Sequence, residues 1–107
     1  MADSICEVRP AGRIDSVTGP AFERDVLQQI DGGGRRLLLD FADLVYISSA
    51  GLRIVLLAAK RMKSAGGRLV LCSLSPQISE VFEISGFNRI LDILPSRDAA
   101  LSTLSGA

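Results

Sequence analysis

The sequence contains no histidine and no tryptophan, and it has only two cysteines. The absence of histidine removes the commonest general base and the commonest metal ligand, which disfavours an enzyme. We expect no cofactor and no metal site. Cys6 and Cys72 each lie within an apolar, strand-like run, without the spacing of a metal or redox motif. We therefore expect two small core residues and no disulfide.

The chain also lacks an excess of charge and a long apolar run. Lysine plus arginine equals aspartate plus glutamate at 12 each, so no strong overall field would attract nucleic acid or an anionic membrane. No apolar segment approaches the ~18 residues that span a bilayer, and the N-terminus carries no basic-then-apolar signal. We expect a cytoplasmic protein with no direct nucleic-acid binding and no membrane insertion. The length of 107 residues predicts one domain, residues 1–107.

Apolar runs of strand length alternate with apolar runs of helix length. We expect strands over residues 4–10, 11–14, 37–39, 68–74 and 90–94, the first two as an opening hairpin. Helices are expected over residues 21–30, 50–64 and 76–86, with a C-terminal helix from residue 96. This alternation predicts an α/β sandwich with a mainly parallel core.

In the most informative stretch, a short loop is expected to join the central strand to the next helix, which opens on Ser48 and Ser49. A capping serine there places its oxygen over the free amides of the first helical turn, where the helix dipole favours an anion such as a phosphate. Gly51 weakens a helix by about 0.5–1 kcal/mol relative to alanine, and Arg53 places a cation at the positive end of the dipole. Two explanations are open: these residues serve packing and solvation, or they expose the serine to a partner, with Arg53 able to pair with a phosphate.

These residues resemble the signature of the STAS domain family, in particular its small stand-alone anti-sigma-factor antagonists. The resemblance covers residues 12–15, 40–53, 66–71 and 84–87, with the sequences Gly-Arg-Ile-Asp, Asp-Phe through Gly-Leu-Arg, Gly-Gly-Arg-Leu-Val-Leu and Ile-Ser-Gly-Phe. It implies a mixed sheet of four to five strands with helices packed mainly on one side. It also implies a binding protein that is not an enzyme, whose partner is an anti-sigma factor with serine kinase activity. A serine phosphatase of the PP2C type would remove the phosphate.

The resemblance assigns roles to individual residues. The phosphorylated serine of the family falls on Ser49, and the family's common aspartate before it is replaced by Ser48, which is the alternative site of modification. Asp15 matches a family aspartate near the phosphorylated serine, where it either positions the serine or caps the next helix.

Helical periodicity places Leu57 on the outer face of the helix among cations that include Arg53 and Lys60. Leu57 is either a scattered apolar surface residue or part of a docking strip beside Ser49, basic at its rim and suited to an acidic patch on a partner. The expected partner-binding residues are Asp15, Ser48, Ser49, Gly51, Arg53, Leu57 and Lys60.

An alternative function keeps the fold: the chain could serve as a STAS accessory subunit of a membrane transporter complex, with Ser49 purely structural. A serine hydrolase is disfavoured, since the sequence has neither a Gly-x-Ser-x-Gly motif nor a histidine to activate the hydroxyl. A monomer is the simplest expectation for a domain that must expose the residue that is modified.

Overall fold

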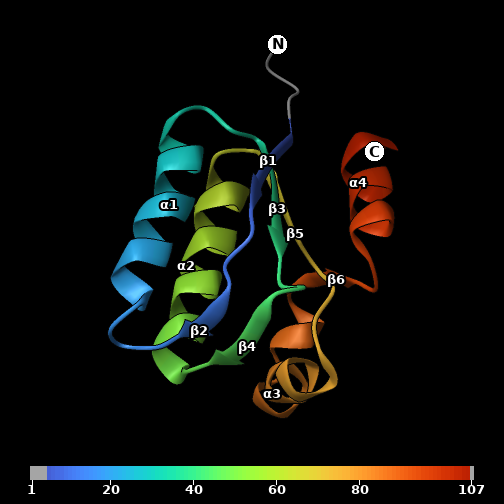
Figure 1. The fold of residues 1–107 in the computed structure, drawn as a ribbon. Helices are drawn as coiled ribbons and strands as arrows, with labels where there is room; N and C mark the ends of the chain where they lie inside the picture. The colour runs from blue at the N-terminus through green and yellow to red at the C-terminus, as the bar shows by residue number, and fades with distance from the viewer. Residues whose placement is uncertain (1–4, 107) are drawn as a thin grey trace.

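The computed structural model describes residues 5–106 and shows an α/β sandwich of six strands and four α-helices (Figure 1). Four strands form one sheet in the order β1-β3-β5-β6, with β1 at Ile5–Val8, β3 at Arg36–Asp40, β5 at Arg68–Cys72 and β6 at Asp92–Leu94. Every pairing in this sheet is parallel, so it is not mixed. The predicted α/β class is confirmed.

The other two strands, β2 (Gly12–Ile14) and β4 (Leu44–Ile47), form a separate parallel pair, which we call the ribbon. The predicted opening hairpin is therefore wrong, because β1 pairs with β3 and β2 pairs with β4. The expectation of a plain loop between the central strand and the helix is also wrong, because β4 occupies it. Gly12, at φ +74°, donates its N–H to the Asp43 carbonyl (3.0 Å) and turns the chain out of β1 into the ribbon.

Two helices lie side by side over one face of the four-stranded sheet: α1 (Gly19–Asp31) and α2 (Ser49–Ser64) (Figure 1). α1 buries Phe22, Val26 and Ile30, which are spaced by four residues and form one stripe. The stripe packs into the main core with Leu37 and Leu39 of β3. This layer fixes the position of α2, and with it the position of the serines at its start.

The opposite face of the sheet is covered by α4 (Arg97–Gly106), which packs Ala100 and Leu104 against Leu38 and neighbouring strand residues. Leu38 points to this face, and Leu37 and Leu39 point to the other. The continuous apolar run in β3 is therefore explained by burial on both faces. The guanidinium of Arg97 holds α4 to β1 through two hydrogen bonds to the Glu7 carboxylate (2.8 and 2.9 Å).

The remaining helix, α3 (Pro76–Ser85), lies at the lower end of the molecule in Figure 1, beside β4. Ser75 caps it, since its Oγ accepts a hydrogen bond from the Ile78 N–H (3.2 Å), and Gly86 ends it at φ +79°. A 3-10 turn, Phe87–Arg89, then leads into β6. Among residues 5–106, no helix has both the length and the apolarity to cross a membrane.

Candidate functional site

The turn that leads toward the serines is fixed by a buried carboxylate at the end of β3. Asp40 is only 2% exposed, and its Oδ1 accepts a hydrogen bond from the Ala42 N–H (3.0 Å). Arg9 closes the same turn from outside, with its Nε 3.0 Å from Oδ2 of Asp43 and its Nη1 3.9 Å from Oδ2 of Asp40. These bonds direct the chain from the sheet into β4 and then into α2.

The two serines at the start of α2 have different roles. Ser48 is the N-cap: its Oγ accepts a hydrogen bond from the Gly51 N–H (3.2 Å), and its carbonyl accepts one from the Leu52 N–H (2.9 Å). The Ser48 N–H donates to the Ile14 carbonyl (2.8 Å), which ties the cap to the ribbon. The structure therefore assigns capping to Ser48 and leaves Ser49 free of that role.

Ser49 is the first residue of α2 and is exposed. Within residues 5–106, its hydroxyl has no hydrogen-bond partner, and the backbone N–H groups of Ser49 and Ala50 have none either. Free amides in the first turn carry the positive end of the helix dipole, so a negative group on Ser49 would meet donors and a favourable field. The geometry suits a hydroxyl that accepts a phosphate.

Gly51 is buried against the ribbon. A Cβ at this position would lie 2.6 Å from Cγ1 of Ile47 and 2.8 Å from Cγ2 of Ile14, closer than real Cβ atoms come to other heavy atoms. The packing explanation for this glycine is therefore confirmed. The side of Gly51 that lacks a side chain faces the protein's own core, so a direct contact of Gly51 with a partner stays a prediction.

Asp15 lies in the loop between β2 and α1, where it organises the start of that helix. Its Oδ1 accepts hydrogen bonds from the backbone N–H groups of Val17 (2.9 Å) and Thr18 (3.1 Å). The hydrogen bond from the Thr18 N–H, followed by that from the Val17 N–H, holds the pKa of the Asp15 carboxyl below its ordinary value. The capping explanation for Asp15 agrees with these bonds.

An open groove of about 310 Å³ separates the start of α1 from the start of α2. Asp15 and Glu23 line it with Arg53 of α2, and Ile54 and Leu57 supply apolar surface. The structure thus brings Asp15 and Arg53 to one groove beside the helix start that carries Ser49.

The prediction that Leu57 stands on the outer face among cations is wrong. Its side chain is half-buried in the groove, because α1 packs beside α2 and covers that flank. Lys60 is exposed but lies 11 residues after Ser49, which is about 16 Å along the helix axis at 1.5 Å per residue. The structure does not bring Lys60 next to the serine.

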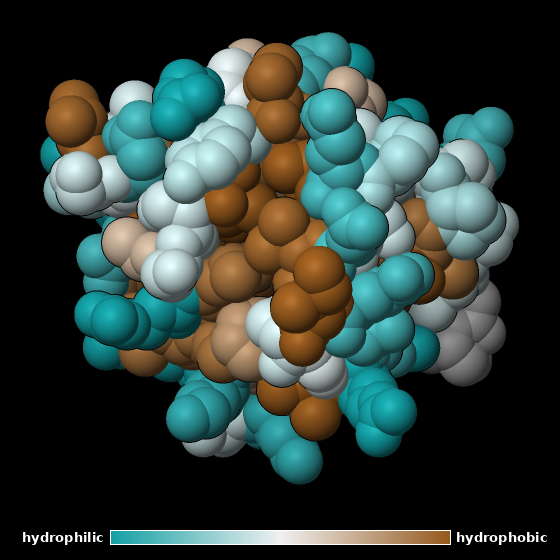
Figure 2. All heavy atoms as spheres, turned by 90° about the horizontal axis from the view of Figure 1, so that it is seen from below, coloured by the Kyte–Doolittle hydropathy of each residue, from teal (hydrophilic) through white to brown (hydrophobic). Residues whose placement is uncertain are grey.

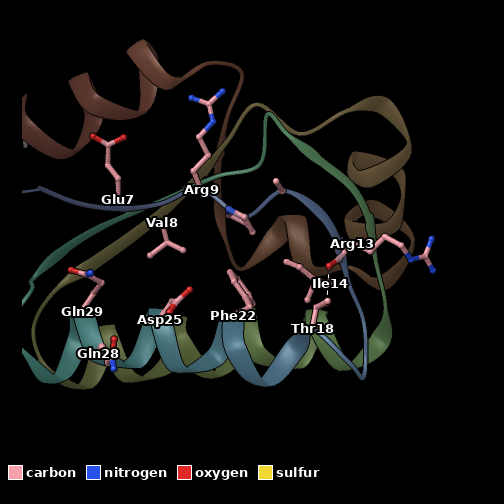
Figure 3. Close-up of a pocket in the computed structure, with 12 residues that line it drawn as sticks. Glu7, Val8, Arg9, Arg13, Ile14, Thr18, Phe22, Asp25, Gln28 and Gln29 are labelled. Carbon is pink, nitrogen blue, oxygen red and sulfur yellow. Dashed lines mark hydrogen bonds between the residues drawn. The ribbon is translucent and has the colours of Figure 1, made fainter.

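A second groove, of about 420 Å³, lies between α1 and the segment that runs from β1 to β2 (Figure 3). Phe22, Asp25 and Gln29 point into it from α1, but Glu7 and Arg9 turn away toward α4 (Figure 3). Those two charged side chains are occupied by their ion pairs with Arg97 and Asp43. This groove therefore lacks a set of polar groups that converge on one point. No cluster of three or more potential metal ligands occurs in the described part of the chain.

The sequence analysis missed the outer face of the ribbon. The guanidinium of Arg13 lies over the ring of Tyr46, 4.2 Å from its centroid, and its Nε is 3.5 Å from Oδ2 of Asp15. Tyr46 and its neighbour Val45 are exposed. The run Leu-Val-Tyr-Ile at residues 44–47 is rich in β-branched and aromatic residues, which is the signal that could have indicated a strand here.

Comparisons with known proteins agree with this fold. The STAS domain family model matches residues 2–100. BtrV of Bordetella bronchiseptica, whose name assigns it as an anti-sigma factor antagonist, is 47% identical over 96 residues, which are 90% of this chain and 83% of that protein. The anti-sigma-B factor antagonist of Bacillus subtilis is 33% identical, over 81% of this chain and 79% of that protein. The crystal structure of an anti-sigma factor antagonist from Mycobacterium paratuberculosis has the same fold, with a TM-score of 0.88, 22% identity, and coverage of 96% and 87%.

Proposed function

Since the chain belongs to the STAS domain family, we propose that it is an anti-sigma-factor antagonist whose binding is switched by phosphorylation of Ser49. The unmodified protein binds an anti-sigma factor that is also a serine kinase, and the phosphorylated protein releases it. A serine phosphatase of the PP2C type resets the switch. The function is one of binding, with no catalysis by this chain. The names of BtrV and of the Bacillus subtilis antagonist support the family role.

One observation carries the assignment to Ser49. It is an exposed hydroxyl at the first position of α2, with no hydrogen bond of its own in the described chain, while the adjacent Ser48 does the capping. Among residues 5–106, modification of Ser49 therefore breaks no hydrogen bond. Ser48 is the weaker candidate, because it is half-buried and its Oγ already accepts a hydrogen bond from the Gly51 N–H, a cap that a phosphate on the same oxygen would disturb.

The physical effect of the phosphate favours loss of the contact over unfolding. A phosphate adds about −1.5 to −2 charges, and the free amides at the start of α2 accommodate that charge locally. Arg53 follows Ser49 by four residues and so lies on the same side of the helix. A partner surface that fits a neutral hydroxyl must instead desolvate the charge. A penalty of about 3 kcal/mol would weaken binding by roughly two orders of magnitude.

The test combines a phosphosite map of the protein from its own cells with pull-downs of wild type, Ser49→Ala and Ser49→Asp. We expect phosphate on Ser49, and a partner with an ATP-binding kinase fold that Ser49→Ala retains and Ser49→Asp loses. Ser64→Asp is the matched control, since Ser64 is an exposed serine at the far end of the same helix. An unmodified Ser49, together with transporter subunits that bind all variants alike, would refute the proposal and favour a transporter accessory subunit.

A further inference from the structure

The ribbon contains an irregularity that exposes two consecutive residues. Gly12 is paired with Leu44 and Arg13 with Tyr46, so Val45 is an extra residue of β4, a β-bulge. In a regular strand, successive side chains point to opposite faces. Here Val45 is 65% exposed and Tyr46 is 41% exposed, while Leu44 and Ile47 on either side are buried. The bulge therefore places two large, largely apolar side chains in solvent next to each other.

Of this exposed pair, Tyr46 is held by its neighbours. Arg13 covers the ring of Tyr46 at 4.2 Å, and the Arg13 guanidinium is in turn paired with Asp15. A side chain that is ordered before binding loses less conformational entropy when a partner arrives. Tyrosine and arginine are also the residue types that contribute most to protein–protein binding energy. A single exposed apolar residue needs no explanation, but an ordered cluster of this composition does.

The cluster adjoins the start of α2. Tyr46 precedes Ser49 by three residues, and the hydrogen bond from the Ser48 N–H to the Ile14 carbonyl joins the ribbon to the helix cap. The ribbon, the start of α2 and α3 share the lower end of the molecule in Figure 1. Seen from that end, apolar side chains gather across the middle of the surface and hydrophilic ones surround them (Figure 2). An apolar centre with a polar rim is typical of a protein interface.

We propose that Arg13, Val45 and Tyr46 form the docking surface for the protein that binds when Ser49 is unmodified. This inference rests on the proposed function and names the side of Ser49 on which the partner lies. The partner presents an apolar pocket for Val45 and the ring of Tyr46, with a carboxylate on its rim for the exposed guanidiniums of Arg13 and Arg53. The expected strip along α2 is not the docking surface, because Leu57 is half-buried against α1 and Lys60 is distant from Ser49.

Photo-crosslinking in cells tests this placement. Benzoylphenylalanine is introduced at position 45 and, separately, at position 60, each in Ser49→Ala and Ser49→Asp backgrounds, and the crosslinked proteins are identified by mass spectrometry. We expect position 45 to crosslink to a protein with an ATP-binding kinase fold in the Ser49→Ala background, with loss of that product in Ser49→Asp. Position 60 should give no such product.

The outcomes separate the two proposals. If the same kinase-fold protein is captured from position 60 and not from position 45, the docking surface is wrong and the switch at Ser49 stands. If neither position captures such a protein in a manner that depends on residue 49, both proposals fail.

Affinity measurements with the captured partner provide a second test. We expect Tyr46→Ala and Val45→Glu each to weaken binding about tenfold or more, as loss of a central contact does. Ile90→Glu is the matched control, since Ile90 is 68% exposed and lies outside the ribbon, and it should change binding less than about twofold. Circular dichroism establishes that each variant is folded. Folded variants at positions 45 and 46 that bind like wild type would overturn the docking surface.

Discussion

Substitution of Gly51 by alanine tests whether close packing of α2 on the ribbon holds Ser49 in position. The new Cβ would lie 2.6 Å from Cγ1 of Ile47 and 2.8 Å from Cγ2 of Ile14. Both isoleucines are buried, at 4% and 1% exposure, so neither can turn into solvent to make room. The start of α2 must therefore move away from the ribbon, or the two side chains must leave their preferred rotamers.

The expected change in the free energy of unfolding follows from two opposing effects. An extra methyl group in a well-packed core costs about 1–3 kcal/mol. Alanine recovers up to about 1 kcal/mol over glycine within a helix, and less in the first turn. We therefore expect Gly51→Ala to lower the free energy of unfolding by about 1–2 kcal/mol, and to lower Tm by about 4–8 °C for each kcal/mol in a domain of this size.

Thermal and urea denaturation followed by circular dichroism measure this change. The same glycine substitution in an Ile47→Ala background is the control, because that variant lacks the Cγ1 atom nearest to the new methyl group. The cost of alanine at position 51 should then shrink, giving a non-additive double-mutant cycle. The steric account is refuted if Gly51→Ala raises Tm, or if its cost is the same in both backgrounds.

Three further predictions concern the two serines at the start of α2 and the ion pair that joins β1 to α4. Ser48→Ala removes the acceptor of the Gly51 N–H and should lower stability by about 0.5–2 kcal/mol in urea denaturation, whereas an unchanged midpoint would exclude a capping role. Ser49→Asp should leave the circular dichroism spectrum unchanged and Tm equal or slightly raised, because a carboxylate at a helix start gains about 0.3–1 kcal/mol; an unfolded variant would contradict a switch that acts on the interface alone. The hydrogen bonds from Arg97 lower the pKa of Glu7, so this carboxylate stabilises the fold above its unfolded pKa, 4.5, and the contribution is lost as the pH falls through the lower folded pKa. Glu7→Gln should therefore lower Tm at pH 7 and have little effect near pH 3, and an equal effect at both pH values would contradict the ion pair.

The parts of the fold that could be predicted from sequence are those that depend on local chemistry. The capping Ser75 and the C-terminal Gly86 mark both ends of α3 because each acts within one helical turn. The apolar run at Leu37–Leu39 indicated a strand, and β3 is a strand that is buried on both faces, as such an unbroken run favours. Periodicity and caps were sufficient for these elements, since they need no knowledge of distant segments.

The errors arose where distant segments decide the structure. The N-terminal strands do not form a hairpin, because β1 finds its partner in β3 and β2 finds its partner in β4, each some thirty residues away. A helical wheel gives the angle of Leu57 but not the presence of α1 beside it. The two explanations for Gly51 could not be separated either, because the atoms that require a glycine belong to Ile14 and Ile47 of the ribbon.

The restraints on Ser49 bear on how a switch at this position can work. Ser48 is bonded both to Gly51 within the helix and to Ile14 in the ribbon, and Gly51 is packed against Ile47. The backbone that presents Ser49 is thus fixed from two sides. Within residues 5–106, the N–H groups of Ser49 and Ala50 have no partner, so they can bind a phosphate without rearrangement. Under the proposed function, the unmodified and the phosphorylated protein therefore have the same surface shape and differ only in the charge at Ser49. A partner on the ribbon would detect that charge through desolvation and repulsion, and the discrimination between the states should weaken as salt screens the exposed part of the interaction.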